Sequence, residues 1–153
     1  MQFGIRLHDA IKAPLEERLK AVHEQGFACA HLALSKVISE NSVAESALTP
    51  GYAMYLKRLF DKYELDVAVL GCYLNLANPD PEKLKAIQNK YMANIRFAAH
   101  LGVGVVGTET GAPNLEYKFE EACWNEESLQ IFINNLRPVV KYAEQMGVLM
   151  AIE

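Results

Sequence analysis

The sequence predicts an α/β protein that forms the first part of a (β/α)₈ barrel, with five parallel strands and four helices. Short apolar runs alternate with amphipathic segments, which is typical of a parallel sheet with right-handed crossovers. Most of these runs are continuously apolar, as expected for strands buried on both faces. A complete barrel needs about 250 residues, or roughly 31 per strand–helix unit. The 153 residues of this chain therefore hold about five units.

The strands are expected in five segments. These are 2–7 (QFGIRL), 28–34 (ACAHLAL), 66–73 (DVAVLGCY), 103–108 (VGVVGT) and 148–153 (VLMAIE). A doubly wound open sheet is the alternative fold. It is disfavoured because the first strand–helix turn (LHDAIK) lacks a glycine-rich phosphate loop.

Each helix is predicted from the signals at its ends and from an apolar stripe. The start signals are Pro14, Thr49–Pro50, Asp80–Pro81 and Asn125, and the stop signals are Gly26, Gly102 and Gly147. The expected inward-facing positions are Leu15, Leu19 and Val22; Leu56, Leu59, Phe60 and Tyr63; Leu84, Ile87, Tyr91 and Ala98; and Leu129, Phe132, Ile133, Leu136 and Val140. The segment 35–49 is predicted to be a long polar loop.

The composition predicts a single globular domain over residues 1–153. Hydrophobic residues make up 51% of the chain and charged residues 22%, which argues against disorder. The net charge of −4 argues against a nucleic-acid-binding protein, because such proteins usually carry a basic face. The sequence has no apolar run of about 18 residues that could span a membrane. Neither a secretion signal nor C-x-x-C spacing is visible among the three cysteines. We expect a soluble cytoplasmic protein that binds neither nucleic acid nor membranes.

The candidate site lies at the carboxyl ends of the predicted strands, where parallel barrels carry their active sites. The residues there are His8, Tyr73, Asn75, Glu109 and Glu153. Carboxylates and an imidazole that converge at one barrel mouth suit a divalent metal ion or proton transfer next to a carbonyl. Simpler interpretations remain open. His8 and Asp9 could form a turn before the first helix, and Glu109 could be a solvated loop carboxylate. Tyr73 and Asn75 could simply end a strand.

Glu153 is the strongest candidate, because a carboxylate directed into a barrel must be paired or bound to a metal. His31, inside the second predicted strand, is interpreted as a core or substrate-facing histidine rather than a metal ligand. The spacing of Cys29 and His31 is too sparse to indicate a zinc site.

Three segments resemble one known family. GIRLHD, LGVGVVGTETG and above all EQMGVLMAIE are similar to the xylose isomerase-like barrels, the sugar phosphate isomerase/epimerase group. The resemblance covers the whole chain in element order. It implies a (β/α)₈ barrel that isomerises or epimerises a sugar or sugar phosphate. It also implies one divalent metal ion (Mn²⁺, Mg²⁺ or Co²⁺), held by carboxylates and a histidine from the fifth to the eighth strand.

Carried over by position, the resemblance makes Glu153 the first metal-binding glutamate and a candidate proton-transfer group. His8, Tyr73, Asn75 and Glu109 would line the sugar pocket. The implied mechanism removes a carbon-bound proton from a metal-chelated sugar and passes through an enediolate. Which sugar is used, whether it is phosphorylated, which metal is bound and whether the reaction is isomerisation or epimerisation all stay open.

Two other functions also stay open. Endonuclease IV-like DNA repair enzymes of the same superfamily place zinc-binding histidines at the ends of the third and fourth strands, where this sequence reads GCYLN and GTETG. That departure argues against cleavage at abasic sites. The other possibility is a non-enzymatic half-barrel that pairs with another chain. Because the fifth strand leaves an unpaired edge, we expect a second copy in a homo-oligomer, or residues outside this sequence, to cover it.

Overall fold

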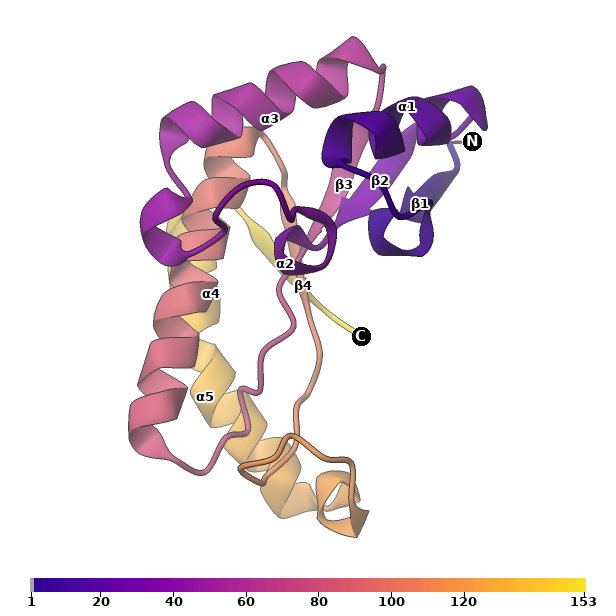
Figure 1. Ribbon diagram of the computed structural model, residues 1–153. Helices are drawn as coiled ribbons and strands as arrows, with labels where there is room; N and C mark the ends of the chain where they lie inside the picture. Colours follow the sequence, from indigo (N-terminus) through magenta and orange to yellow (C-terminus); the bar gives the residue numbers. More distant parts are fainter. Residues whose placement is uncertain (1) are drawn as a thin grey trace.

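The computed structural model describes residues 2–153 and consists of one parallel sheet with helices along one side (Figure 1). The strands are β1 (Gly4–Arg6), β2 (Cys29–Leu32), β3 (Asp66–Gly71), β4 (Val105–Thr108) and β5 (Leu149–Ile152). The α-helices are α1 (Leu15–Glu24), α2 (Leu34–Val37), α3 (Pro50–Lys62), α4 (Pro81–Leu101) and α5 (Glu126–Gln145). Three short 3₁₀ helices join them: η1 (Leu7–Asp9), η2 (Glu45–Ala47) and η3 (Glu121–Trp124).

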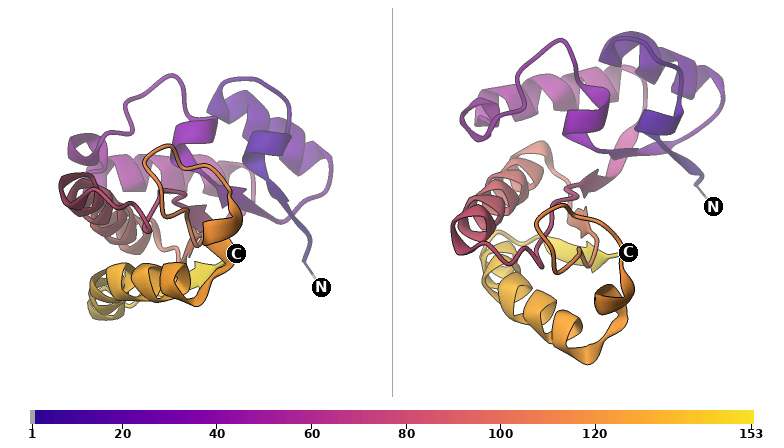
Figure 2. Two further views of the ribbon diagram at one scale, coloured as in Figure 1. Left: turned by 90° about the horizontal axis from the view of Figure 1, so that it is seen from below. Right: turned by 60° about the horizontal axis from the view of Figure 1, so that its bottom comes forward.

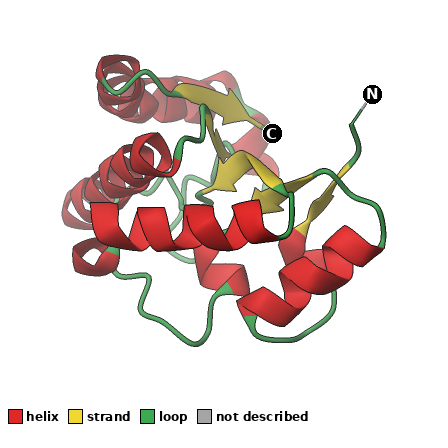
Figure 3. Cartoon of the chain, turned by 90° about the horizontal axis from the view of Figure 1, so that it is seen from above, coloured by secondary structure: helices red, strands yellow, loops and turns green. Residues whose placement is uncertain are grey.

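The strand order confirms the predicted barrel topology. The sheet runs β1-β2-β3-β4-β5, and every neighbouring pair is parallel. A doubly wound sheet would reverse its order at a switch point, and this sheet has no such reversal. Figure 3 shows the helices along the outside of the curved sheet, and Figure 2 shows the same arrangement from two further directions. The chain therefore forms a five-stranded part of a (β/α)₈ barrel.

Three helices begin at the predicted capping residues. The side chain of Thr49 accepts a hydrogen bond from the backbone N–H of Tyr52. Asp80 accepts from the N–H groups of residues 82 and 83, and Asn125 accepts from that of residue 128. Each cap satisfies helix N–H groups that otherwise lack a partner, which typically stabilises a protein by about 1 kcal/mol.

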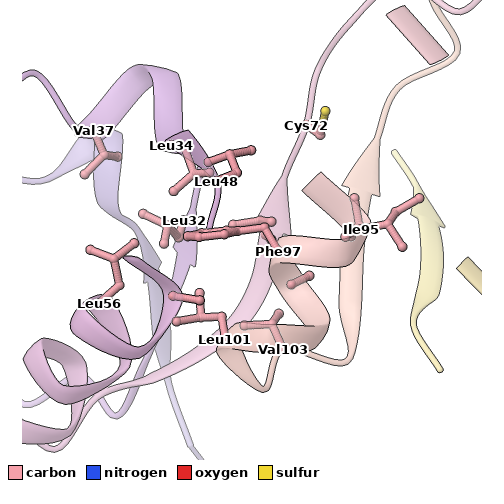
Figure 4. Packing of buried hydrophobic residues seen from close by; sticks show 14 of the residues in the cluster. Leu32, Leu34, Val37, Leu48, Leu56, Cys72, Ile95, Phe97, Leu101 and Val103 are labelled. Carbon is pink, nitrogen blue, oxygen red and sulfur yellow. The ribbon is translucent and has the colours of Figure 1, made fainter. Parts of the chain in front are cut away.

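The core lies between the sheet and the helices (Figure 4). Leu32, Leu70 and Val106 project from the strands and are completely buried. Helices α3 and α4 cover them with Leu56 and Phe97, which are also completely buried. The predicted inward positions of α1, α3 and α4 are all buried or half-buried. Burial of this apolar surface is the main force that holds the sheet against its helices.

The prediction of a polar loop at 35–49 is correct for most of the segment, which is irregular and largely exposed, but it missed two helical turns and three buried apolar residues. This segment continues α2, contains η2, and buries Val37, Ile38 and Leu48. Figure 4 shows Val37 and Leu48 above Leu32 and Phe97. Apolar residues that follow no helical or strand period can still close the end of a core, and here they cover the region between β2 and α4.

The expected burial of α5 and of the outer strands is also corrected. Leu129, Ile133 and Val140 are 45%, 37% and 41% exposed, although Phe132 and Leu136 on the same helix are buried. Leu149 on β5 is 71% exposed, and β1 is mostly exposed. The physical reason is that β5 lies at one edge of the sheet and α5 is the helix packed beside that edge. An apolar stripe is buried only where a neighbouring element covers it.

Among residues 2–153, no helix has both the length and the hydropathy needed to cross a membrane.

Candidate functional site

The inner face of the sheet, opposite the helices, brings together residues from β2, β3 and β4. Glycines make this possible. A Cβ atom at Gly71 would lie 2.3 Å from Nε2 of His31 and 2.7 Å from Cε2 of Tyr73. A Cβ atom at Gly107 would lie 3.6 Å from the Tyr73 hydroxyl. Without side chains at these two positions, the histidine and tyrosine rings can meet on the inner face.

The Tyr73 hydroxyl connects His31 to Glu153. It lies 3.1 Å from Nε2 of His31 and donates a hydrogen bond to Oε1 of Glu153 at 3.2 Å. The backbone N–H of Glu153 donates to the carbonyl oxygen of Thr108 at 2.9 Å, which continues the pairing of β4 with β5. The register of the last strand thus sets the position of the Glu153 backbone, and Tyr73 orients its carboxylate.

His8 joins this group from η1. Its ring packs edge-to-face on the ring of His31, with 5.5 Å between the centroids. Burial lowers the pKa of both histidines, and the positive charges of Lys36 and Arg6 lower these pKa values further. Asp9 beside His8 and Glu153 near His31 act in the opposite direction. Both imidazoles are therefore neutral at pH 7, and each offers one donor and one acceptor nitrogen.

Tyr73 remains a hydrogen-bond donor over the physiological pH range. Burial raises its pKa to about 12, and the negative charge of Glu153 contributes to the shift. Its ring also makes a cation–π contact with Lys36, whose Nζ lies 5.0 Å from the ring centroid. The sequence analysis placed Tyr73 at a strand end. The structure adds the partners that make it the centre of the cluster His8–His31–Tyr73–Glu153.

Glu109 lies in the loop between β4 and α5 and accepts a hydrogen bond from the hydroxyl of Tyr117. Burial and this carboxylate both raise the pKa of Tyr117, so its hydroxyl stays protonated. The charge of Glu109 also helps to raise the pKa of Tyr73. Within residues 2–153, however, no hydrogen bond links Glu109 to the cluster. Its role in sugar binding stays a prediction.

Asn75 holds two loops together. Its oxygen accepts from the backbone N–H groups of Ala77 (3.1 Å) and Ala112 (3.0 Å). Its amide donates to the carbonyl oxygens of Ala112 (2.8 Å) and Asn114 (3.2 Å). A carboxamide has two donors and two acceptor sites, so these four bonds leave none for a sugar. The structure therefore favours a role in positioning the loops, and binding of a sugar by Asn75 stays untested.

Sequence reasoning left two residues out of the site. His31 was interpreted as a core or substrate-facing histidine, and the structure places it inside the cluster. The available signal was the two-residue alternation of β2, which puts Cys29 and His31 on the same face. The other residue, Arg18, lies within the α1 pattern; it is buried (6% exposed), and its charge helps to lower the pKa of His8.

A divalent metal ion does not fit the described residues alone. Among residues 2–153, no three His, Cys, Asp or Glu side chains converge closely enough to hold one. Glu153 supplies one carboxylate at the barrel mouth, whereas protein metal sites usually combine several oxygen or nitrogen ligands. A metal site that includes Glu153 would need ligands from outside this chain.

Comparison with known proteins agrees with the geometry. The family model for the xylose isomerase-like TIM barrel matches residues 19–153. Among solved structures, a D-tagatose 3-epimerase-like protein is 22% identical, with a TM-score of 0.69 over 99% of this chain and 52% of that one. A D-psicose 3-epimerase from Clostridium cellulolyticum H10, solved with D-tagatose, is 19% identical, with a TM-score of 0.68 over 98% and 51%.

A further similar structure is a probable 3-DHS dehydratase from Bacillus anthracis. It is 12% identical, with a TM-score of 0.65 over 99% of this chain and 52% of that one. This chain spans about half the length of these three structures. No curated protein sequence matches it. The family match over most of the chain and the parallel 1-2-3-4-5 sheet lead to one conclusion: the chain belongs to the xylose isomerase-like TIM barrel family.

Proposed function

We propose that this chain supplies part of the active site of a sugar or sugar phosphate isomerase or epimerase. The observation that carries the proposal is the Glu153 carboxylate, held at the barrel mouth by strand pairing and by the Tyr73 hydroxyl at 3.2 Å. The Glu153 carboxylate is exposed and accepts a hydrogen bond from Tyr73, and such a group beside neutral imidazoles is suited to proton transfer at a carbon next to a carbonyl. Family membership supports this reaction class, as do two similar structures, a D-tagatose 3-epimerase-like protein and a D-psicose 3-epimerase.

In the proposed reaction Glu153 acts as the base. Its carboxylate takes the proton from the hydroxyl-bearing carbon, and the electron pair of the broken C–H bond enters an enediolate. Return of a proton to the neighbouring carbon, with transfer of the hydroxyl proton from one oxygen to the other, would complete an isomerisation. An epimerisation would instead need an acid on the opposite face of the same carbon, supplied from outside this chain. Tyr73 keeps the carboxylate oriented. Nε2 of His8 is the imidazole nitrogen left to bond a sugar oxygen, because Nε2 of His31 faces the Tyr73 hydroxyl and both Nδ1 atoms are buried.

Metal dependence is part of the proposal and needs residues beyond this chain. Glu153 would be one ligand of a Mn²⁺, Mg²⁺ or Co²⁺ ion, and further polypeptide or a partner would supply the rest. A bound ion would polarise the carbonyl and stabilise negative charge on oxygen. Glu153→Gln keeps the shape of the side chain but removes the charge that a hard cation prefers. Calorimetric Mn²⁺ titration should therefore show weaker binding by this variant.

The activity test uses the whole polypeptide that the gene encodes. Free and phosphorylated ketoses and aldoses are assayed in D₂O with added Mn²⁺, and deuterium in the product reports proton exchange at carbon. Glu153→Gln should lower kcat/KM by about 10²- to 10⁴-fold, the range expected for loss of a general base. The matched control is Glu144→Gln, which removes the same charge at an exposed position on α5. Turnover equal to wild type in Glu153→Gln would refute the proposed function.

A further inference from the structure

A cavity lies beside the cluster, between the β1–α1 connection and α2. Its volume is about 460 Å³, and its polar lining consists of His8, Lys12, Arg18, Ser35, Lys36 and Ser39. No carboxylate lines it among the described residues. This is unusual in a chain whose net charge is −4. A concave site with several cations, two hydroxyl groups and no acid is suited to an anion.

Arg18 carries a buried positive charge that no described carboxylate neutralises. Its side chain is buried, and within residues 2–153 it forms no ion pair. Nη1 donates to the carbonyl oxygen of Leu7 at 2.7 Å, and Nη2 donates to that of Ala13 at 3.3 Å. Nε is buried without a partner. A buried guanidinium is ordinarily compensated by a negative charge, and neutral carbonyl oxygens do not provide one.

The carboxylates of the neighbouring segments pair with groups other than the cavity lysines and Arg18. Asp9 forms an ion pair with Arg6 at 2.7 Å and lies 4.0 Å from Nε2 of His8. Oε1 of Glu40 accepts from the backbone N–H of Leu15 (2.9 Å), and Oε2 accepts from the N–H (3.1 Å) and the hydroxyl (3.3 Å) of Ser39. Neither residue lines the cavity. Within residues 2–153, Lys12, Arg18 and Lys36 form no ion pair, so their positive charges are available to a ligand.

The cavity adjoins the proposed active site through two shared side chains. His8 lines the cavity and packs on His31, with 5.5 Å between the ring centroids. Lys36 lines it as well and lies over the ring of Tyr73. We propose that this cavity binds the phosphate group of the substrate, which makes the substrate a sugar phosphate. This inference rests on the proposed isomerase or epimerase function. A phosphate suits the cavity better than a single carboxylate, because its oxygens can contact several cations and hydroxyl groups at once.

The test measures binding, so it does not depend on turnover. Inorganic phosphate, D-fructose 6-phosphate and D-fructose are titrated into the encoded protein by calorimetry. Fructose 6-phosphate should bind at least tenfold more tightly than fructose and should compete with inorganic phosphate. Lys12→Gln and Lys36→Gln should each weaken fructose 6-phosphate binding by about three- to tenfold. Lys20→Gln is the matched control: it removes the same charge at an exposed position of α1 outside the cavity.

Arg18→Met should abolish phosphate binding. Because Arg18 also bonds to two backbone carbonyls, this variant is checked for folding by circular dichroism, and the lysine variants decide the question if it unfolds. Equal binding of fructose and fructose 6-phosphate would overturn the proposal, as would equal weakening by Lys20→Gln. Inorganic phosphate binding without competition from fructose 6-phosphate would also overturn it. If the sugar phosphate binds as expected but no sugar is turned over, the site stands and the proposed function fails.

Discussion

Replacing Tyr91 by phenylalanine tests how α4 holds the ends of β3 and β4 beneath the site. Tyr91 is completely buried. Its hydroxyl lies 3.1 Å from the backbone nitrogen of Leu74, 3.0 Å from the oxygen of Leu74 and 2.5 Å from Oγ1 of Thr108. Phenylalanine keeps the ring but leaves these groups without this partner. An unsatisfied group of this kind costs about 1–3 kcal/mol. We therefore expect the free energy of unfolding to fall by about 2 kcal/mol.

Urea unfolding followed by circular dichroism measures this loss. With an m-value of about 2 kcal/mol per molar urea, the midpoint should fall by about 1 M. The control is Tyr55→Phe, which removes a hydroxyl from a ring that is 52% exposed and stacks on Tyr52. It should change the free energy by less than about 0.5 kcal/mol. If Tyr91→Phe shifts the midpoint no more than this control does, the hydroxyl does not connect the strands as argued.

Two further predictions concern pH and the loops. Because the pKa values of His8 and His31 are lowered in the folded protein, the unfolded state binds more protons just below pH 6.5. In urea titrations, stability should be highest well above pH 6.5 and should fall as the pH drops below 6.5. His31→Gln should reduce that slope, and a rise in stability as the pH drops below 6.5 would contradict the assignment. Asn75→Ala should lower the free energy of unfolding by about 1–3 kcal/mol, because it leaves the N–H groups of Ala77 and Ala112 unpaired. Amide exchange at Ala112 should accelerate, and unchanged exchange would show that Asn75 does not hold the loops.

The local elements could be predicted because their signals are local. Thr49, Asp80 and Asn125 act as caps through bonds to residues two or three positions ahead. The alternation of strands and helices then leaves few topologies, since crossovers between parallel strands are right-handed. The family resemblance, strongest at residues 147–153, agrees with the family match.

The site was predicted only in outline, because its contacts join distant parts of the chain. Residues that follow strands converge in any parallel barrel, which is why Tyr73 and Glu153 could be named in advance. Their hydrogen bond joins residues 80 positions apart, and the bond between Tyr73 and His31 joins residues 42 positions apart. Such pairs depend on the register of the strands and on the space left by Gly71. No local pattern specifies either one.

The sequence by itself therefore determined the order of the elements, the helix ends and the parallel barrel topology, because these depend on short-range periodicity and chain connectivity. The tertiary structure decided which apolar faces are covered, and it left Leu129 and Leu149 exposed where the last elements have no neighbour. It also decided that Asn75 holds loops together and that the buried charge of Arg18 faces no carboxylate. Burial and electrostatic compensation depend on what packs against a side chain, and that is set only when distant segments meet.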